Sequence, residues 1–131
     1  MVSNLPDTLF DKMMRFADML GTINDTNILR TCECRIEDNI FVQRLAYIES
    51  SRYGMQMLFA KLFHDEIINQ EMSEICKRWT KVKNDMIKVI VSKRLSLIQN
   101  LKEEIMTIVI LEKTIYEKLN QLEDGMILMQ Q

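Results

Sequence analysis

The sequence predicts an all-α protein of four or five helices, with a long antiparallel helical hairpin in its C-terminal half. Its 131 residues include one proline, Pro6, and three glycines, Gly21, Gly54 and Gly125. Proline and glycine disfavour the interior of a helix more strongly than any other residues. Apolar residues also recur every three or four positions through most of the chain, which is the pattern of an amphipathic helix. The helices are therefore expected to bury one face each against other helices, as in a bundle or coiled coil.

The length and composition predict one ordered domain over residues 1–131. Hydrophobic residues make up 47% of the chain and charged residues 27%, a globular balance. Within this domain we expect an N-terminal amphipathic helix and loop (residues 1–24), middle helices (25–69), and a basic helix followed by an acidic, apolar-striped helix (70–131).

The first helix is predicted over residues 7–20, and Gly21, the next residue, is expected to end it. Its apolar stripe consists of Leu9, Met13, Phe16 and Leu20. A second helix is expected over residues 25–37, with Asp25 or Thr26 as its cap.

The middle of the chain carries two apolar stripes whose faces differ. The first stripe contains Leu45, Ile48, Met55, Phe59 and Leu62, and the second contains Ile75, Trp79, Val82, Met86 and Val89. A bend near Asn69 would reconcile the two faces. Gly54 lies within the first stripe and is interpreted as tolerated or as a kink.

The last helix has the most regular stripe in the chain. We expect it to follow a turn at Gln99-Asn100 and to stop at Asp124-Gly125. Such a stripe requires a partner helix, within the chain or on another protein. The predicted apolar interaction residues are Ile108, Ile115, Leu119, Leu122 and Met126, with Trp79 as either an aromatic anchor or a core residue.

The near-neutral net charge of −2 conceals a basic segment. Residues 77–102 contain eight basic side chains and one acidic one, whereas the flanking segments are both acidic. One interpretation is that the basic helix lies antiparallel to the acidic last helix, and that opposite charges favour this pairing. The other is that Lys77, Lys81 and Lys88 share an exposed face that binds an acidic protein or nucleic acid. The acidic pI of 5.5 and the lack of aromatic residues between the lysines disfavour nucleic acid.

The sequence contains no recognisable constellation of catalytic or cofactor-binding residues. Cys32, Cys34, His64 and Cys76 do not have the spacing of a zinc module, so no metal site is expected. His64 has no neighbouring nucleophile motif, and no Glu-x-x-His pair is present for a di-iron bundle. We therefore predict a protein that is not an enzyme and that uses no cofactor.

The cysteines and the N-terminus predict an intracellular protein with reduced thiols. The number of cysteines is odd, and the first residues lack the basic start and apolar core of a secretory signal. No uncharged stretch approaches the length needed to span a membrane. The expected partner is a helical protein, either a second copy of the chain or a subunit of a larger complex.

Two short segments resemble influenza-type nuclear export proteins. The first contains Ser3-Asn4, Asp11, Arg15 and Met19, and the second contains Arg94-Leu95, Asn100, Glu103 and Ile105. The resemblance implies an N-terminal export helix joined to a C-terminal helical hairpin. It further implies an adaptor that links viral ribonucleoprotein to the export machinery, with the export signal on Met13, Phe16, Met19 and Leu20. Leu9, Met13, Phe16 and Leu20 also have the loose hydrophobic spacing of such a signal.

Overall fold

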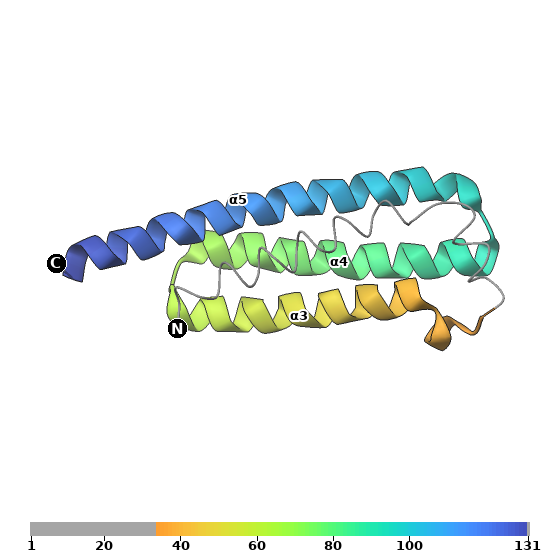
Figure 1. The fold of residues 1–131 in the computed structure, drawn as a ribbon, viewed down its shortest axis with the longest axis horizontal. Coiled ribbons are helices and arrows are strands. Elements are labelled where there is room, and N and C mark those ends of the chain that lie inside the picture. Colours follow the sequence, from red (N-terminus) through yellow and green to blue (C-terminus); the bar gives the residue numbers. More distant parts are fainter. Residues whose placement is uncertain (1–33, 131) are drawn as a thin grey trace.

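The computed structural model describes the backbone of residues 34–130 and the side chains of residues 34–121, and this part of the chain is all-α (Figure 1). Its three α-helices are α3 (Ile40–Leu62), α4 (Glu66–Ser92) and α5 (Ile98–Gln130). Two short 3₁₀ turns, η3 (Ile36–Asp38) and η4 (Leu95–Leu97), precede α3 and α5. The all-α prediction is confirmed, but the described residues hold fewer helices than the four or five predicted. The predicted helix over residues 7–20 lies outside the described residues, as does most of the helix predicted over 25–37.

Helix α4 lies between α3 and α5, and consecutive helices run in opposite directions (Figure 1). It packs against both neighbours, whereas the backbones of α3 and α5 approach each other less closely. The arrangement therefore differs from a two-helix hairpin, because α3 supplies a second partner for α4.

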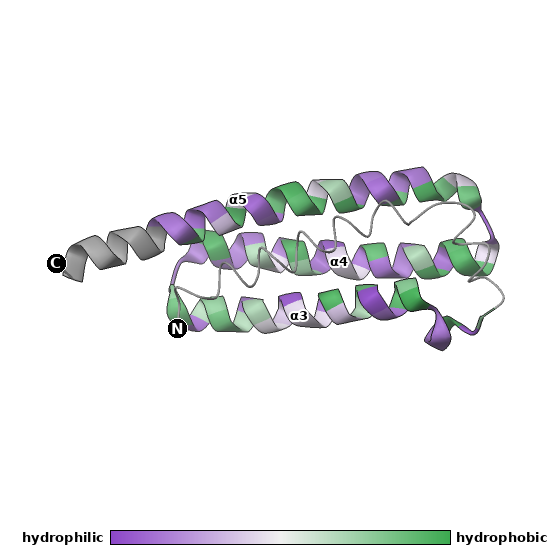
Figure 2. Cartoon of the chain, viewed as in Figure 1, coloured by the Kyte–Doolittle hydropathy of each residue, from purple (hydrophilic) through white to green (hydrophobic). Residues whose placement is uncertain are grey.

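The core is a continuous apolar cluster shared by the three helices. Figure 2 shows hydrophobic and hydrophilic residues alternating along α4, as expected for a helix with one buried face. The largest fully buried apolar side chains are Trp79, Leu45, Met72, Ile75, Met86, Leu101, Ile105, Ile108 and Leu119. The apolar periodicity thus identified the buried faces of α4 and α5.

The turn between α3 and α4 lies at residues 63–65, so the bend predicted near Asn69 is wrong. His64 reverses the chain direction with a positive φ of 49°. The carboxylate of Asp65 then caps α4 by accepting a hydrogen bond from the backbone N–H of Ile68 at 3.0 Å. Asn69 lies inside α4.

The turn between α4 and α5 also lies earlier than predicted. Lys93 ends α4 in the left-handed conformation with a φ of 55°, and η4 leads directly into α5 at Ile98. Gln99-Asn100 and Asp124-Gly125, which were predicted to be a turn and a stop, both lie inside α5.

Helix α3 begins at a buried cap and runs without interruption past its glycine. The Asn39 side-chain oxygen accepts hydrogen bonds from the backbone N–H groups of Phe41 and Val42 at 3.0 and 3.2 Å. Gly54 lies inside the helix, and a Cβ built on it would have no neighbour within 4 Å. Gly54 is therefore tolerated within a continuous helix and faces open space.

Candidate functional site

Three of the predicted interaction residues on α5 are buried inside the chain. Ile108, Ile115 and Leu119 expose 1%, 4% and 2% of their surface and belong to the shared core. They are packed by the chain's own helices and are not exposed for a partner. The side chains of Leu122 and Met126 lie outside the described side chains.

Of the two interpretations of Trp79, an aromatic anchor or a core residue, the structure supports the core residue. It is fully buried, and its indole Nε1–H donates a hydrogen bond to Glu112 Oε1 at 2.6 Å. The guanidinium carbon of Arg52 lies 5.8 Å from the centre of a Trp79 ring, within range of a cation–π contact. Trp79 thus connects α4 to charged groups on both neighbouring helices.

Arg52 of α3 and Glu112 of α5 form a buried, two-point ion pair. Arg52 Nε donates to Glu112 Oε1 at 2.8 Å, and Arg52 Nη2 donates to Oε2 at 3.1 Å. Their side chains expose 2% and 1% of their surface. Removing two charges from water is costly, and this cost is offset only when the geometry is good and further hydrogen bonds are made. Here both carboxylate oxygens are bound, and Trp79 supplies the third hydrogen bond.

The sequence interpretation missed this ion pair, although the sequence contains a signal for it. Arg52 occupies the position in the α3 stripe between Ile48 and Met55. Glu112 likewise interrupts the α5 stripe between Ile108 and Ile115. A single charged residue at a core position of each of two helices indicates a buried pair. The sequence interpretation instead treated the acidic residues of the last helix, Glu112 among them, as charges that pair with the basic helix.

A small recess lies beside Glu112 at the meeting point of the three helices. Its walls come from α3, α4 and α5 and include Met55, Met72 and Tyr116. The space measures about 10 Å³, which is close to the volume needed for the centre of one water molecule. This recess is thus a packing defect next to the ion pair.

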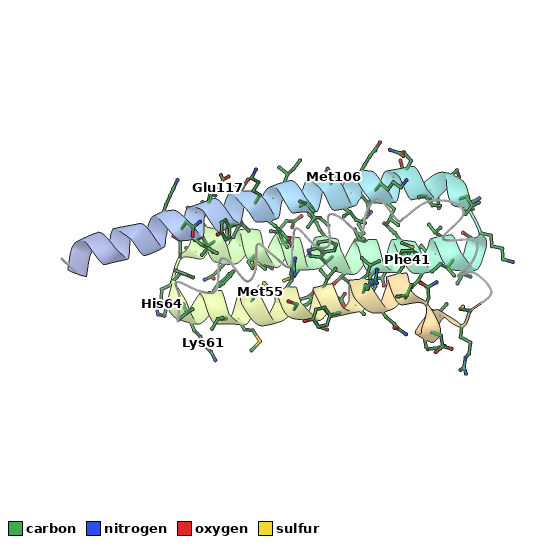
Figure 3. All side chains as sticks on the ribbon, in the orientation of Figure 1. Phe41, Met55, Lys61, His64, Met106 and Glu117 are labelled. Carbon is green, nitrogen blue, oxygen red and sulfur yellow. The ribbon has the colours of Figure 1, made fainter. Side chains whose placement is uncertain are left out.

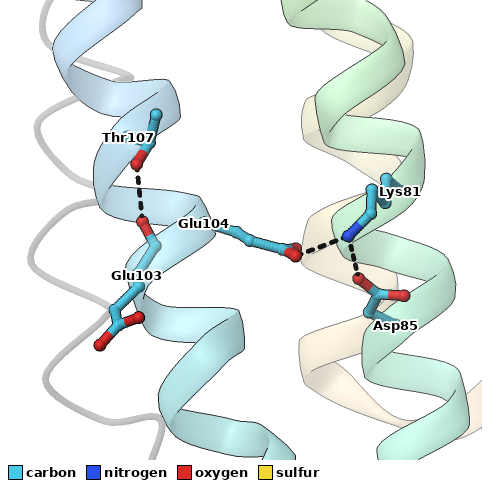
Figure 4. Close-up of polar contacts among 5 residues, drawn as sticks. All are labelled: Lys81, Asp85, Glu103, Glu104 and Thr107. Atoms are coloured by element: carbon cyan, nitrogen blue, oxygen red, sulfur yellow. Dashed lines mark hydrogen bonds and ion pairs between the residues drawn. The ribbon is translucent and has the colours of Figure 1, made fainter.

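Among the described side chains, acidic residues bind Lys81 but not Lys77 or Lys88. Lys81 Nζ binds Asp85 Oδ2 at 3.0 Å within α4 and Glu104 Oε1 on α5 (Figure 4). The hydrogen bonds that Lys81 donates to Glu104 and Asp85 raise the pKa of Lys81 above its ordinary value. Lys77 and Lys88 are exposed, and no ion pair within residues 34–121 involves them. The predicted basic face is therefore partly neutralised by the chain itself.

Other ion pairs connect α4 to both of its neighbours. Lys83 binds Glu49 of α3 at 2.7 Å, and Lys118 of α5 binds Glu71 of α4. Burial acts to raise the pKa of Glu49, but hydrogen bonds from Lys83 and Thr80 and the charge of Lys83 outweigh it, so the pKa is lowered. Opposite charges thus support the α4–α5 pairing through Lys81, and they support the α3–α4 pairing as well.

The cysteines and His64 do not come together in the described part of the chain. Cys34 and His64 are exposed, Cys76 is buried, and Cys32 lies outside the described residues. Within residues 34–121, no group of three or more His, Cys, Asp or Glu side chains is placed to hold a metal ion.

We expect Cys76 to resist thiol reagents in the folded protein while Cys34 reacts. Burial raises the pKa of the Cys76 thiol from 9.0 to about 11, so the reactive thiolate is scarce at pH 8. Because the unfolded chain loses this proton first, the thiol also makes the stability of the fold decline as the pH rises from about 9 to about 11. Timed alkylation at pH 8 followed by peptide mapping would measure each cysteine. Equal rates for Cys34 and Cys76 in the native protein would contradict this expectation.

Two further sequence predictions concern the N-terminus and membranes. The export-type helix with Leu9, Met13, Phe16 and Leu20 lies outside the described residues, so its function stays a prediction. Among the described helices, none combines the length and the apolar character needed to cross a membrane.

Comparison of the chain with protein-family models, with curated proteins and with solved structures found no match.

Proposed function

We propose that the protein acts without catalysis, as an adaptor, assembly or regulatory subunit that binds a helical protein through the end of α5. The observation that carries this proposal is the length of α5. Gln121 borders the same surface hollow as Asp65 and Ile67, at the start of α4. Residues 122–130 continue as helix past this point, beyond the turn between α3 and α4 (Figure 1).

The apolar stripe of α5 continues in the sequence where the bundle ends. Ile108, Ile115 and Leu119 are covered by α3 and α4. Leu122 and Met126 follow them at the same helical spacing. A helix that carries an apolar stripe past its own bundle is suited to bind a groove or helix on another protein.

The proposal is tested by replacing Leu122 and Met126 together with glutamate. We expect this variant to fold normally and to lose the partner, because two charges would have to be buried at the contact. A partner isolated by affinity capture from the native host would be purified and recombined with the chain, and light scattering would report the complex. The complex of the unaltered chain should survive about 1 M salt, because apolar contacts are not screened by ions.

The matched control replaces Glu117 with lysine on the opposite face of α5. Glu117 is exposed and points away from α4 (Figure 3). This variant should bind the partner as the unaltered chain does. A complex that persists when Leu122 and Met126 are both glutamate would sink the proposal. Leu119 is unsuitable for this test because a charge there would disrupt the core.

A second candidate is the binding of an acidic protein through α4, favoured by Lys77 and Lys88, which are exposed and form no ion pair within residues 34–121. This function predicts the opposite salt response, with association weakening steeply as ionic strength rises. Replacing Lys77 and Lys88 with glutamate should then abolish binding, whereas the changes at Leu122 and Met126 should not.

A further inference from the structure

The buried stripes of α4 and α5 have members separated alternately by three and four residues. The stripe of α4 consists of Ile68, Met72, Ile75, Trp79, Val82, Met86 and Val89. The stripe of α5 consists of Ile98, Leu101, Ile105, Ile108, Glu112, Ile115 and Leu119. This pattern repeats every seven residues. A stripe moved along its neighbours by one heptad, about 10.5 Å, therefore meets them with the same pattern of apolar side chains.

Apolar packing by itself gives little preference between two registers of α5. If residues 98–104 left the helix and α5 moved by one heptad toward the α4–α5 turn, Ile98 and Leu101 would lose their burial. Leu122 and Met126 would enter the core at the other end of α5. Two large apolar residues would be uncovered and two would be covered, so the buried apolar area would change little. We call this arrangement the shifted register.

One buried group of three residues distinguishes the two registers. Arg52, Trp79 and Glu112 lie at the same level of the bundle and are joined by hydrogen bonds of 2.6, 2.8 and 3.1 Å. In the shifted register Leu119 would lie at the level of Arg52, and Glu112 would lie where Ile105 is now. Both charges would be buried without a partner, which is strongly destabilising. The present register is thus the one that pairs them.

We propose that Arg52 and Glu112 are positioning residues: their buried pair, completed by Trp79, fixes the register of α5 and so keeps residues 122–130 beyond the end of the bundle (Figure 1). A single polar position within an apolar stripe sets the register of coiled coils in the same way. The register is a property of the chain by itself. Its consequence for partner binding rests on the function proposed above, because the shifted register would draw the end of α5 into the chain's own core.

The exposed ion pairs between α4 and α5 match the present register but contribute less to it. Lys81 binds Glu104 and Lys118 binds Glu71, and these side chains expose between 35% and 62% of their surface. Ion pairs this exposed contribute little to stability, because water screens the charges and long side chains must be ordered. Separating a pair costs most where water cannot reach the charges, which is at the buried pair.

Crosslinking of cysteines in the isolated full chain reports the register. Lys118 contacts Glu71 across α4 and α5, so Glu71→Cys with Lys118→Cys gives the present-register crosslink. One heptad further along α5, Glu71→Cys with Gly125→Cys gives the shifted-register crosslink. Both pairs are introduced with Cys32 and Cys34 replaced by serine, and the thiol crosslinker is shorter than the shift of about 10.5 Å. With the core unaltered, the present-register crosslink should dominate.

The decisive variant moves the carboxylate by one heptad, with Glu112→Leu and Leu119→Glu. In the shifted register, residue 119 of this variant takes the place of Glu112 beside Arg52 and Trp79. We therefore expect the shifted-register crosslink to replace the present-register one. A pair that only stabilised the fold would lower stability without changing the register. The matched control Lys81→Gln removes an exposed ion pair and should leave the crosslinks unchanged.

A second variant keeps the test decisive if the moved carboxylate prevents folding. Arg52→Met with Glu112→Met removes both charges, so the shifted-register crosslink should rise at least about tenfold over the unaltered core. The proposal is overturned if this double variant leaves the crosslinks unchanged. It is equally overturned if the chain with the moved carboxylate folds and keeps the present-register crosslink.

Partner binding is measured separately on the variant with the moved carboxylate. Loss of the partner together with the shift in register supports both proposals. A chain that shifts its register and still binds the partner contradicts the function proposed above and leaves the role of the buried pair standing.

Discussion

Replacing Glu112 with alanine is expected to lower the free energy of unfolding by about 3–5 kcal/mol, because it leaves the buried Arg52 guanidinium without its counter-ion. The same substitution removes the acceptor of the Trp79 Nε1–H bond. Glu112 is 1% exposed, so water cannot replace the lost partner without opening the core. Urea denaturation followed by far-UV circular dichroism would measure the change.

A double-mutant cycle separates the interaction energy of the Arg52–Glu112 pair from the free-energy cost of burying the two charges. The variant with both Arg52→Met and Glu112→Met removes both charges and keeps similar side-chain volumes. Buried pairs replaced in this way are often neutral or stabilising, so the double variant should be more stable than Arg52→Met or Glu112→Met alone, although it leaves the Trp79 Nε1–H without its acceptor. A Glu112→Ala change that costs no more than an exposed substitution, about 0.5 kcal/mol, would contradict the buried pair.

Ile108→Ala is expected to lower the free energy of unfolding by about 2–5 kcal/mol, because truncation leaves a cavity in a close-packed core. Ile108 is 1% exposed and lies one turn from Glu112 on α5. Ile110→Ala is the matched control, with the same chemistry on the same helix at a side chain that is 62% exposed. It should change stability by no more than about 0.5 kcal/mol.

The comparison of these two variants decides the role of Ile108, which the sequence interpretation assigned to a partner interface. If Ile108 were an interface residue, its truncation would weaken association and spare the fold. Equal denaturation midpoints for Ile108→Ala and Ile110→Ala would exclude the core position that the structure gives it.

Within the described residues, the sequence predicted the helix interiors but placed the helix ends wrongly, for a physical reason. Helix interiors follow from apolar periodicity and from the lack of proline and glycine, and both are properties of the local sequence. The two turns depend on His64 and Lys93, which adopt the left-handed conformation that glycine or asparagine usually adopts. Neither histidine nor lysine indicates a turn in a sequence, so the two turns were predicted too late in the chain, at Asn69 and at Gln99-Asn100.

The candidate binding surfaces were likewise only partly predictable from the sequence. The stripe of α5 was visible in the sequence, but a stripe does not state whether its partner helix belongs to the same chain. The structure shows that Ile108, Ile115 and Leu119 pack in the core of the chain's own bundle. It also shows that α5 continues beyond them. The inward-facing charges of α3 were hidden in the sequence, because only the tertiary structure shows that Glu49 and Arg52 reach Lys83 and Glu112.

The sequence by itself determined that the chain is helical and that its helices carry apolar stripes, because both follow from spacing along one helix. Only the tertiary structure decided which stripes face each other, that Arg52, Trp79 and Glu112 meet at the centre, and which face of α3 remains open. These properties depend on residues far apart in the chain, and the free energy of burying a charge or an apolar side chain is set by the neighbours that packing provides.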